Sequence, residues 1–146
     1  MTLRDRIPLE PVASDVVRLN QWLDAAFLRC EFDPSIAADL KLCINEVFAN
    51  LISYAFKDTA NPEIAVEIEL QCGQAAAVIS DNGQHFDLRT WPAAEKPTSL
   101  ADAREGGFGI ALIRDRATHI NYERVNTTNR LRITCAGSRA TGHARS

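Results

Sequence analysis

The first residues of this chain that could carry chemistry are Glu46 and Asn50, a carboxylate and a carboxamide four positions apart. On a helix this spacing puts both side chains on one face, one above the other. Their neighbours are apolar, and a carboxylate among apolar residues costs free energy unless it is paired or lies at a cleft. A ligand site would use both groups, whereas a solvent-exposed helix edge is the simpler interpretation of this pair alone.

A second candidate is the segment Ile79-Ser80-Asp81-Asn82-Gly83, an apolar run that ends in a turn sequence. Asn-Gly favours a turn because it supplies positive φ, so local structure alone would account for this segment. The functional interpretation is that Asp81, held rigidly at a strand end, accepts a hydrogen bond from an amino group such as that of adenine. Gly83 would then let the ligand approach the backbone.

The third candidate is the run Glu105-Gly106-Gly107-Phe108-Gly109-Ile110, which opens an apolar helix. Glycines ahead of a helix N-terminus leave backbone N–H groups free to meet a phosphate. The run is not the G-x-G-x-x-G dinucleotide fingerprint, because the preceding strand and the third glycine are missing, and no G-K-[ST] Walker sequence occurs in the chain. Taken alone, the glycine cluster is a weak signal.

Hydrophobic periodicity predicts the elements that must position these three segments. Helices are expected at 14–30, 35–56 and 108–116, and strands at 3–9, 64–70, 75–80, 118–124 and 129–135. The helix 35–56 carries Glu46 and Asn50 and is the most apolar of these elements, so it must pack against a sheet. Prolines close the strand 3–9, which is therefore expected at the edge of the sheet.

Capping and turn residues set the predicted boundaries. Ser14 is expected to cap the first helix, and either Asp33 or Ser35 the second. Gly73 is expected to turn the hairpin between the second and third strands, and residues 126–129 the hairpin between the last two.

Residues 84–107 have no sustained period, and a loop of this length inside a compact domain is usually functional, often a lid. The tail 137–146 is small and polar and is expected to be disordered. We therefore expect one α+β domain over residues 1–136. Its two layers would be a mostly antiparallel sheet and helices that cover one face of it.

The net charge of −3 gives no electrostatic reason to expect binding to nucleic acid or to an anionic membrane. No signal-peptide core or membrane-length apolar stretch is visible, so a cytoplasmic protein is expected. The cysteines form no C-x-x-C pair and are expected to be reduced and buried, and the histidines are expected to take no part in the chemistry. These residues are Cys30, Cys43, Cys72, Cys135, His85, His119 and His143.

Taken in order, the three segments resemble the Bergerat-fold (GHKL) ATPases, the superfamily of histidine kinases, gyrase, Hsp90 and MutL. The shared layout is E-x-x-x-N on an apolar helix, D-x-G after a strand, an irregular loop, and G-x-G opening a helix. Within that superfamily the chain resembles the short serine-kinase branch, the anti-sigma factors of the RsbW and SpoIIAB type. The resemblance covers nearly the whole chain, and Phe86 and Asp87 after the D-x-G favour this branch over the histidine kinases.

The resemblance implies a role for each matching residue. Glu46 matches the general base toward the hydroxyl or water that attacks the γ-phosphate of ATP. Asn50 matches the magnesium ligand, since its amide oxygen suits a hard cation. Asp81 matches the carboxylate that recognises adenine, with Gly83 beside it. Tyr54 departs from the pattern, because relatives often carry histidine there, and little change to the nucleotide site is expected.

The phosphate end of the site is also implied by the resemblance. Gly107 and Gly109, with the backbone N–H groups near Phe108 and Ile110, match the phosphate-contacting end of the lid. Arg104 matches a γ-phosphate partner in the lid, although the order Arg104-Glu105 is not uniform in the family.

The cofactors implied are ATP and Mg²⁺, and the function implied is that of a protein serine kinase. Its substrate would be a STAS-domain anti-sigma factor antagonist, its second partner a sigma factor, and its assembly a homodimer. Two alternatives stay open: a nucleotide-gated module that sequesters a partner without phosphorylating it, and the ATPase fragment of a histidine kinase. The sequence identifies neither the sigma factor nor the antagonist.

Overall fold

The computed structural model of the chain describes residues 2–85 and 107–137, the side chains of Gly107 and Phe108 excepted. The elements are β1 (Leu3–Leu9), α1 (Ser14–Arg29), α2 (Pro34–Asn50), the π-helical turn η1 (Leu51–Ala55), β2 (Ile64–Gln71), β3 (Gln74–Asp81), α4 (Gly107–Arg116), β4 (His119–Val125) and β5 (Thr128–Ala136). Each predicted helix and strand is present, with bounds that differ by a few residues at most. No helix within the described residues is long and apolar enough to cross a membrane.

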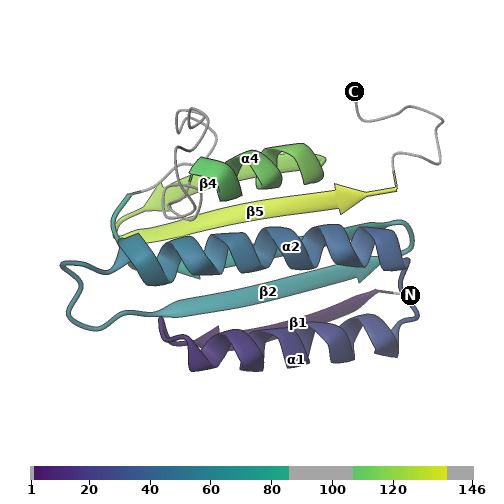
Figure 1. The fold of residues 1–146 in the computed structure, drawn as a ribbon, viewed down its shortest axis with the longest axis horizontal. Helices are drawn as coiled ribbons and strands as arrows, with labels where there is room; N and C mark the ends of the chain where they lie inside the picture. The colour runs from purple at the N-terminus through teal and green to yellow at the C-terminus, as the bar shows by residue number, and fades with distance from the viewer. Residues whose placement is uncertain (1, 86–106, 138–146) are drawn as a thin grey trace.

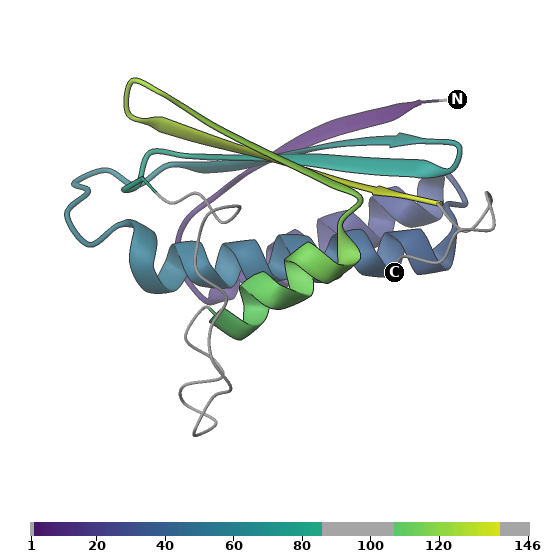
Figure 2. The same ribbon diagram turned by 90° about the horizontal axis from the view of Figure 1, so that it is seen from above.

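The strands form one five-stranded sheet in the order β1-β2-β3-β5-β4, and every neighbouring pair is antiparallel. Figures 1 and 2 show the three helices on one face of this sheet, with α2 across its centre. The predicted two-layer α+β architecture is therefore confirmed, and so is the edge position of β1. Because apolar residues alternate along the strands, one row of each strand packs against the helices and forms the core.

Both hairpins turn at residues that tolerate positive φ. Gly73 has a φ of +76° between β2 and β3, as predicted. Between β4 and β5 the residue with positive φ is Asn126, and Val125 already pairs with Thr128. The prediction of a turn over 126–129 was therefore too long, because a two-residue turn suits the twist of an antiparallel pair. Asn129 consequently lies inside β5.

The two long helices begin differently. Asp33 caps α2 by accepting hydrogen bonds from the backbone N–H groups of Ser35 and Ile36, so one of the two predicted caps is confirmed. The predicted cap at Ser14 is wrong. Ser14 is the first helical residue of α1, and the side chain of Asp15 instead accepts from the backbone N–H of Glu10 at 2.7 Å.

The predicted single helix 35–56 is an α-helix only as far as Asn50. The α-helix ends there, and residues Leu51–Ala55 continue as one π-helical turn. A π-turn is uncommon and often lies at a functional site. Here the backbone oxygen of Ala55 accepts the N–H of Gln84 at 2.9 Å, which ties η1 to the segment that follows β3.

The cysteine prediction holds for two of the four residues. Cys43 and Cys135 are buried, and their hydrogen bond together with burial raises the pKa of the Cys43 thiol, which keeps it protonated. Cys72 is exposed at the β2–β3 hairpin and Cys30 is half-buried, contrary to the prediction. Gly137 still donates to the backbone oxygen of Gly73 at 2.9 Å, and the rest of the predicted tail lies outside the described residues.

Candidate nucleotide site

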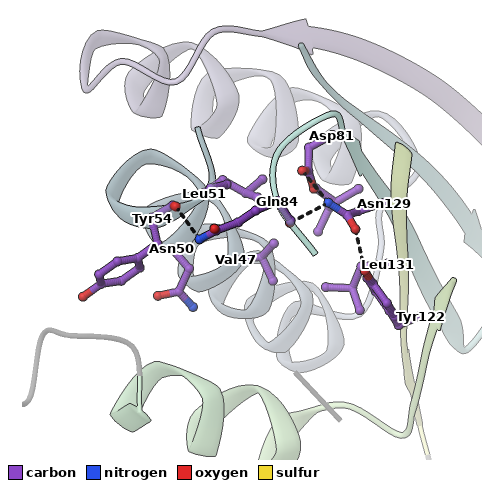
Figure 3. Close-up of a pocket in the computed structure, with 11 residues that line it drawn as sticks. Val47, Asn50, Leu51, Tyr54, Asp81, Gln84, Tyr122, Asn129 and Leu131 are labelled. Atoms are coloured by element: carbon purple, nitrogen blue, oxygen red, sulfur yellow. Dashed lines mark hydrogen bonds between the residues drawn. The ribbon is translucent and has the colours of Figure 1, made fainter. Parts of the chain in front are cut away.

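A pocket lies between the C-terminal end of α2, the π-turn η1, and the inner faces of β3, β4 and β5 (Figure 3). It measures about 540 Å³, its open mouth included. Its lining is apolar except for a few polar groups that converge on it, as is usual for small-molecule sites. The lining residues are Val47, Asn50, Leu51, Tyr54, Ala55, Ile79, Asp81, Gln84, Tyr122, Asn129 and Leu131. Two predicted site residues, Asn50 and Asp81, thus share one pocket although they come from different elements.

Asn50 lies at the junction of α2 and η1 with its side chain on the pocket wall. Its amide nitrogen Nδ2 is buried, and none of the described residues forms a hydrogen bond with it. A buried amide group left unpaired costs about 1–3 kcal/mol, so this orphaned atom is a site that a polar ligand would complete. The amide oxygen on the same group is the kind of hard donor that magnesium prefers.

Glu46 lies one turn before Asn50 on α2 and is half-buried. Gly109 of α4 packs directly against it: a Cβ atom added to this glycine would overlap with the Glu46 carboxylate oxygen Oε1. The Glu46 carboxylate therefore rests against the first turn of α4. The predicted base and the predicted phosphate glycine are brought together, which their separation in the sequence does not require.

The first turn of α4 begins at Gly107, one residue earlier than predicted. The N–H groups of the first turn of any helix lack intrahelical partners and carry partial positive charge. The predicted phosphate-contacting residues Gly107, Phe108, Gly109 and Ile110 supply this turn, and the Ile110 side chain anchors it in the core with no exposed surface. Arg104, the predicted γ-phosphate partner, lies outside the described residues, as do Phe86 and Asp87.

Asp81 ends β3 and is buried, with 7% of its surface exposed. Its oxygen Oδ1 accepts the backbone N–H of Gly83 at 2.8 Å and the side-chain Nδ2 of Asn129 at 2.9 Å. Burial raises the pKa of Asp81, while these two bonds and the charge of Arg124 act in the opposite direction. Within the described residues both donors meet Oδ1, which leaves Oδ2 to accept a hydrogen bond from a ligand in the pocket.

Gly83 lies in a close backbone contact that the sequence did not predict. Neither Asn82 nor Gly83 has positive φ, so the predicted Asn-Gly turn geometry is wrong. A Cβ atom on Gly83 would instead lie 2.6 Å from the backbone oxygen of Ala55. Gly83 therefore lets η1 approach the end of β3, and Asn82 fixes the same segment through bonds to the backbone of Asn61 and Glu63.

Asn129 is a site residue that sequence reasoning missed. The register of the sheet places it directly opposite Asp81, and it is 4% exposed. Besides Asp81, its Nδ2 donates to the backbone oxygens of Gly83 and Gln84, while its Oδ1 accepts from Tyr122 and Arg124. The sequence feature that could have identified it is a polar residue in the row of β5 that is otherwise apolar and faces the core.

His85 lies beside the pocket but makes no described contact with Asp81 or Asn50. Its ring meets the edge of Tyr122 at a centroid distance of 5.3 Å, and the side chain is exposed. No group of three or more histidine, cysteine, aspartate or glutamate side chains within residues 2–85 and 107–137 could hold a metal ion.

Two known protein kinases are similar to this chain in sequence. The serine/threonine-protein kinase BtrW of Bordetella bronchiseptica is 27% identical over 130 residues, which is 89% of this chain and 92% of BtrW. The serine-protein kinase RsbW of Listeria innocua is 31% identical over 118 residues, 77% of this chain and 75% of RsbW.

A solved structure of RsbU and RsbW domains from Mycobacterium tuberculosis superposes over 92% of this chain with a TM-score of 0.57, at 20% identity. This chain spans 32% of that longer one, and at such identity the likeness concerns the fold. The sequence family described as the histidine kinase-like ATPase domain matches residues 9–135. Since that match takes in nearly all of the described structure, the chain belongs to the histidine kinase-like ATPase domain family.

Proposed function

We propose that this chain is an ATP-dependent protein serine kinase of a partner switch. It would phosphorylate a serine of a STAS-domain anti-sigma factor antagonist and otherwise hold a sigma factor. The observation that carries the proposal is the convergence of Asp81 and Asn50 on one pocket, with Glu46 one helical turn away. The kinase names of its relatives BtrW and RsbW support the reaction, and similarity to an anti-sigma F factor of Clostridium botulinum supports the partners.

The pocket accounts for nucleotide binding through its own residues. Oδ2 of Asp81 would accept the adenine amino group, and the apolar walls formed by Val47, Leu51 and Leu131 would cover the base. The phosphates would extend past Asn50 toward the first turn of α4, where N–H groups meet anions. Magnesium, held by Asn50 and the phosphates, would offset the phosphate charge that a chain of net charge −3 does not.

Glu46 would act on the substrate hydroxyl. The serine oxygen attacks the γ-phosphorus, the bond from that phosphorus to the bridging oxygen of ADP breaks, and the serine proton passes to the Glu46 carboxylate. Phosphoryl transfer depends on positioning and charge neutralisation more than on covalent help. We further propose that residues 1–136 are the catalytic domain, that the protein acts in the cytoplasm, and that it forms a homodimer, as the resemblance implies.

The test is phosphoryl transfer itself. The protein would be incubated with magnesium and γ-labelled ATP and with the STAS-domain protein encoded nearest its gene, and the labelled residue would be mapped by mass spectrometry. Label on a serine of the partner is expected. ATP binding without transfer to any STAS candidate would favour the sequestering module instead, and label on a histidine would favour a histidine kinase.

Asn50→Ala is expected to weaken ATP binding in a manner that depends on magnesium. Loss of one cation ligand should lower ATP affinity about tenfold with magnesium and much less with EDTA present, since only the metal-bound complex uses the amide oxygen. Calorimetric titration under both conditions measures this difference. Asn121→Ala, an exposed asparagine on the outer face of β4, is the matched control. An equal loss under both conditions would contradict the metal-binding role.

Asp81→Asn is expected to lower ATP affinity at least tenfold, because an amide NH₂ would replace the acceptor that faces adenine. The stability of the nucleotide-free protein is not expected to fall. Burial raises the pKa of Asp81, so the ionised carboxylate costs free energy in the folded state relative to the unfolded chain. The nucleotide-free variant should therefore unfold at the same or a higher temperature than the wild type at pH 7.

The raised pKa of Asp81 also predicts that the difference in thermal stability between the wild type and Asp81→Asn depends on pH. The stability that a raised pKa contributes is fully present below the unfolded pKa of Asp81 and is lost as pH rises through the folded pKa. Lowering the pH through this window should therefore stabilise the wild type relative to Asp81→Asn. Thermal unfolding from pH 7 to pH 4 without nucleotide measures it, and a variant that is markedly less stable at pH 7 would contradict this account.

A further inference from the structure

A row of three polar side chains crosses the sheet beneath the pocket. The register pairs Asp81 of β3 with Asn129 of β5, and Asn129 with Arg124 of β4. All three belong to the inward rows of their strands, which otherwise carry apolar residues. Tyr122 lies two residues before Arg124 on the same face, and Figure 3 shows Asn129 between Asp81 and Tyr122.

The Asn129 amide has hydrogen-bond donors at its oxygen and hydrogen-bond acceptors at its nitrogen. On the side of Oδ1 lie two donors, the Tyr122 hydroxyl and Nη1 of Arg124, the latter at 2.8 Å. On the side of Nδ2 lie three acceptors: Oδ1 of Asp81 and the backbone oxygens of Gly83 and Gln84, at 2.9, 3.2 and 3.0 Å. A guanidinium can only donate, so Arg124 fixes which end of the amide is oxygen. The NH₂ must therefore face Asp81.

This orientation determines the chemistry that Asp81 offers to a ligand. An NH₂ group against Oδ1 favours the ionised carboxylate, which can only accept hydrogen bonds. Arg124 reinforces the arrangement by donating to the Gly83 oxygen at 2.9 Å, which holds the segment whose N–H also meets Asp81. The carboxylate is thereby kept an acceptor in spite of its burial.

We propose that Asn129, oriented by Arg124 and Tyr122, is a positioning residue that makes the pocket select 6-amino purines over 6-oxo purines. The inference rests on the proposed binding of ATP in this pocket. An acceptor at Asp81 matches the amino group of adenine and opposes the oxygen at the same position of hypoxanthine or guanine. Discrimination of this kind is large where a buried polar group would be left unpaired.

The most informative variant is Asn129→Asp. In this variant a carboxylate oxygen would replace the NH₂ group that now donates to three acceptors. Two adjacent buried carboxyl groups then share one proton, because both cannot ionise at so short a distance. A protonated Asp81 can donate to a 6-oxo group. Affinity for ATP should fall and affinity for inosine triphosphate should rise, so that the ratio of the two dissociation constants changes roughly 10- to 100-fold toward inosine triphosphate.

A second pair of variants tests the orienting residues without placing a new charge in the site. Arg124→Met and Tyr122→Phe, separately and combined, should each reduce the preference for ATP, with the largest reduction in the double variant. Arg130→Met is the matched control, because Arg130 lies on the outer face of the sheet and pairs with Glu123 at 3.6 Å. It should leave the ratio unchanged.

Calorimetric titration of each variant with ATP and with inosine triphosphate, in magnesium, gives the ratio, and thermal unfolding confirms that each variant is folded. If Asn129→Asp does not fold, the Arg124 and Tyr122 variants decide the question. Equal losses of affinity for both nucleotides in the variants, with an unchanged ratio, would overturn the inference but would not contradict the proposed function of the wild-type chain. A wild-type chain that binds neither nucleotide would instead contradict the proposed function, and the inference with it.

Discussion

Replacing Glu46 with glutamine is expected to lower the rate of phosphoryl transfer by roughly 10²–10⁴-fold while ATP affinity stays unchanged. Glutamine keeps the shape of the side chain against Gly109 but cannot take the proton of the attacking hydroxyl. No adenine or metal contact is assigned to Glu46, so the bound nucleotide should not sense the change. The effect is thus confined to the chemical step.

Single-turnover transfer from labelled ATP to the STAS partner measures this rate, and calorimetry measures the affinity. Glu10→Gln is the matched control, since Glu10 is exposed at the end of β1 on another part of the surface. Transfer at the wild-type rate by Glu46→Gln would remove Glu46 from the role of base. A parallel loss of ATP affinity would show that Glu46 serves binding instead.

Replacing Gly109 with alanine is expected to reduce transfer roughly 10²-fold with little change in stability, because small displacements of a catalytic group can have effects of that size. The added methyl would occupy the position of Glu46 Oε1. That atom is the far end of a flexible side chain, so the overlap is relieved by rotation of Glu46 rather than by unfolding. Alanine also favours a helix over glycine by about 1 kcal/mol, which offsets the remaining strain.

The two measurements for Gly109→Ala are single-turnover transfer and the free energy of unfolding in urea. Ala111→Ser, an exposed position on the same helix, is the control for general effects on α4. The contrast with Gly83→Ala is also informative, because the overlap there is with the backbone of Ala55 and should reduce stability directly. A Gly109→Ala variant with wild-type transfer would contradict the placement of Glu46 against α4.

Local sequence patterns predicted most of the helices and strands of this structure. The alternation in 64–70 and 75–80 predicts two paired strands, and the apolar spacing in 35–56 predicts a helix that must pack on them; both predictions are confirmed. Glu46 and Asn50 could be placed on one face because helical geometry is local. That Asn50 shares one pocket with Asp81, while Glu46 lies one helical turn away, followed from the resemblance and from the fold that it implies, not from spacing.

The two missed features of the site depend on contacts between residues distant in the sequence. Asn129 reaches Asp81 because the register between β3 and β5 places position 129 opposite position 81. The predicted strand 129–135 already includes Asn129, but no local pattern determines which residue of another strand lies opposite it. The role of Gly83 depends on the π-turn, since only that backbone brings the Ala55 oxygen against it. Hydrophobic periodicity in the segments around Asn129 and Gly83 does not predict these contacts between distant residues.

The most direct test of the nucleotide site is a crystal structure of the protein with magnesium and a non-hydrolysable ATP analogue. We expect the adenine amino group within hydrogen-bond distance of Asp81 Oδ2 and the metal bound to the amide oxygen of Asn50. The γ-phosphate is expected at the N–H groups of the first turn of α4, beside the Glu46 carboxylate. An analogue bound away from the pocket between α2 and β3, or oriented with its phosphates toward Asp81, would contradict the account.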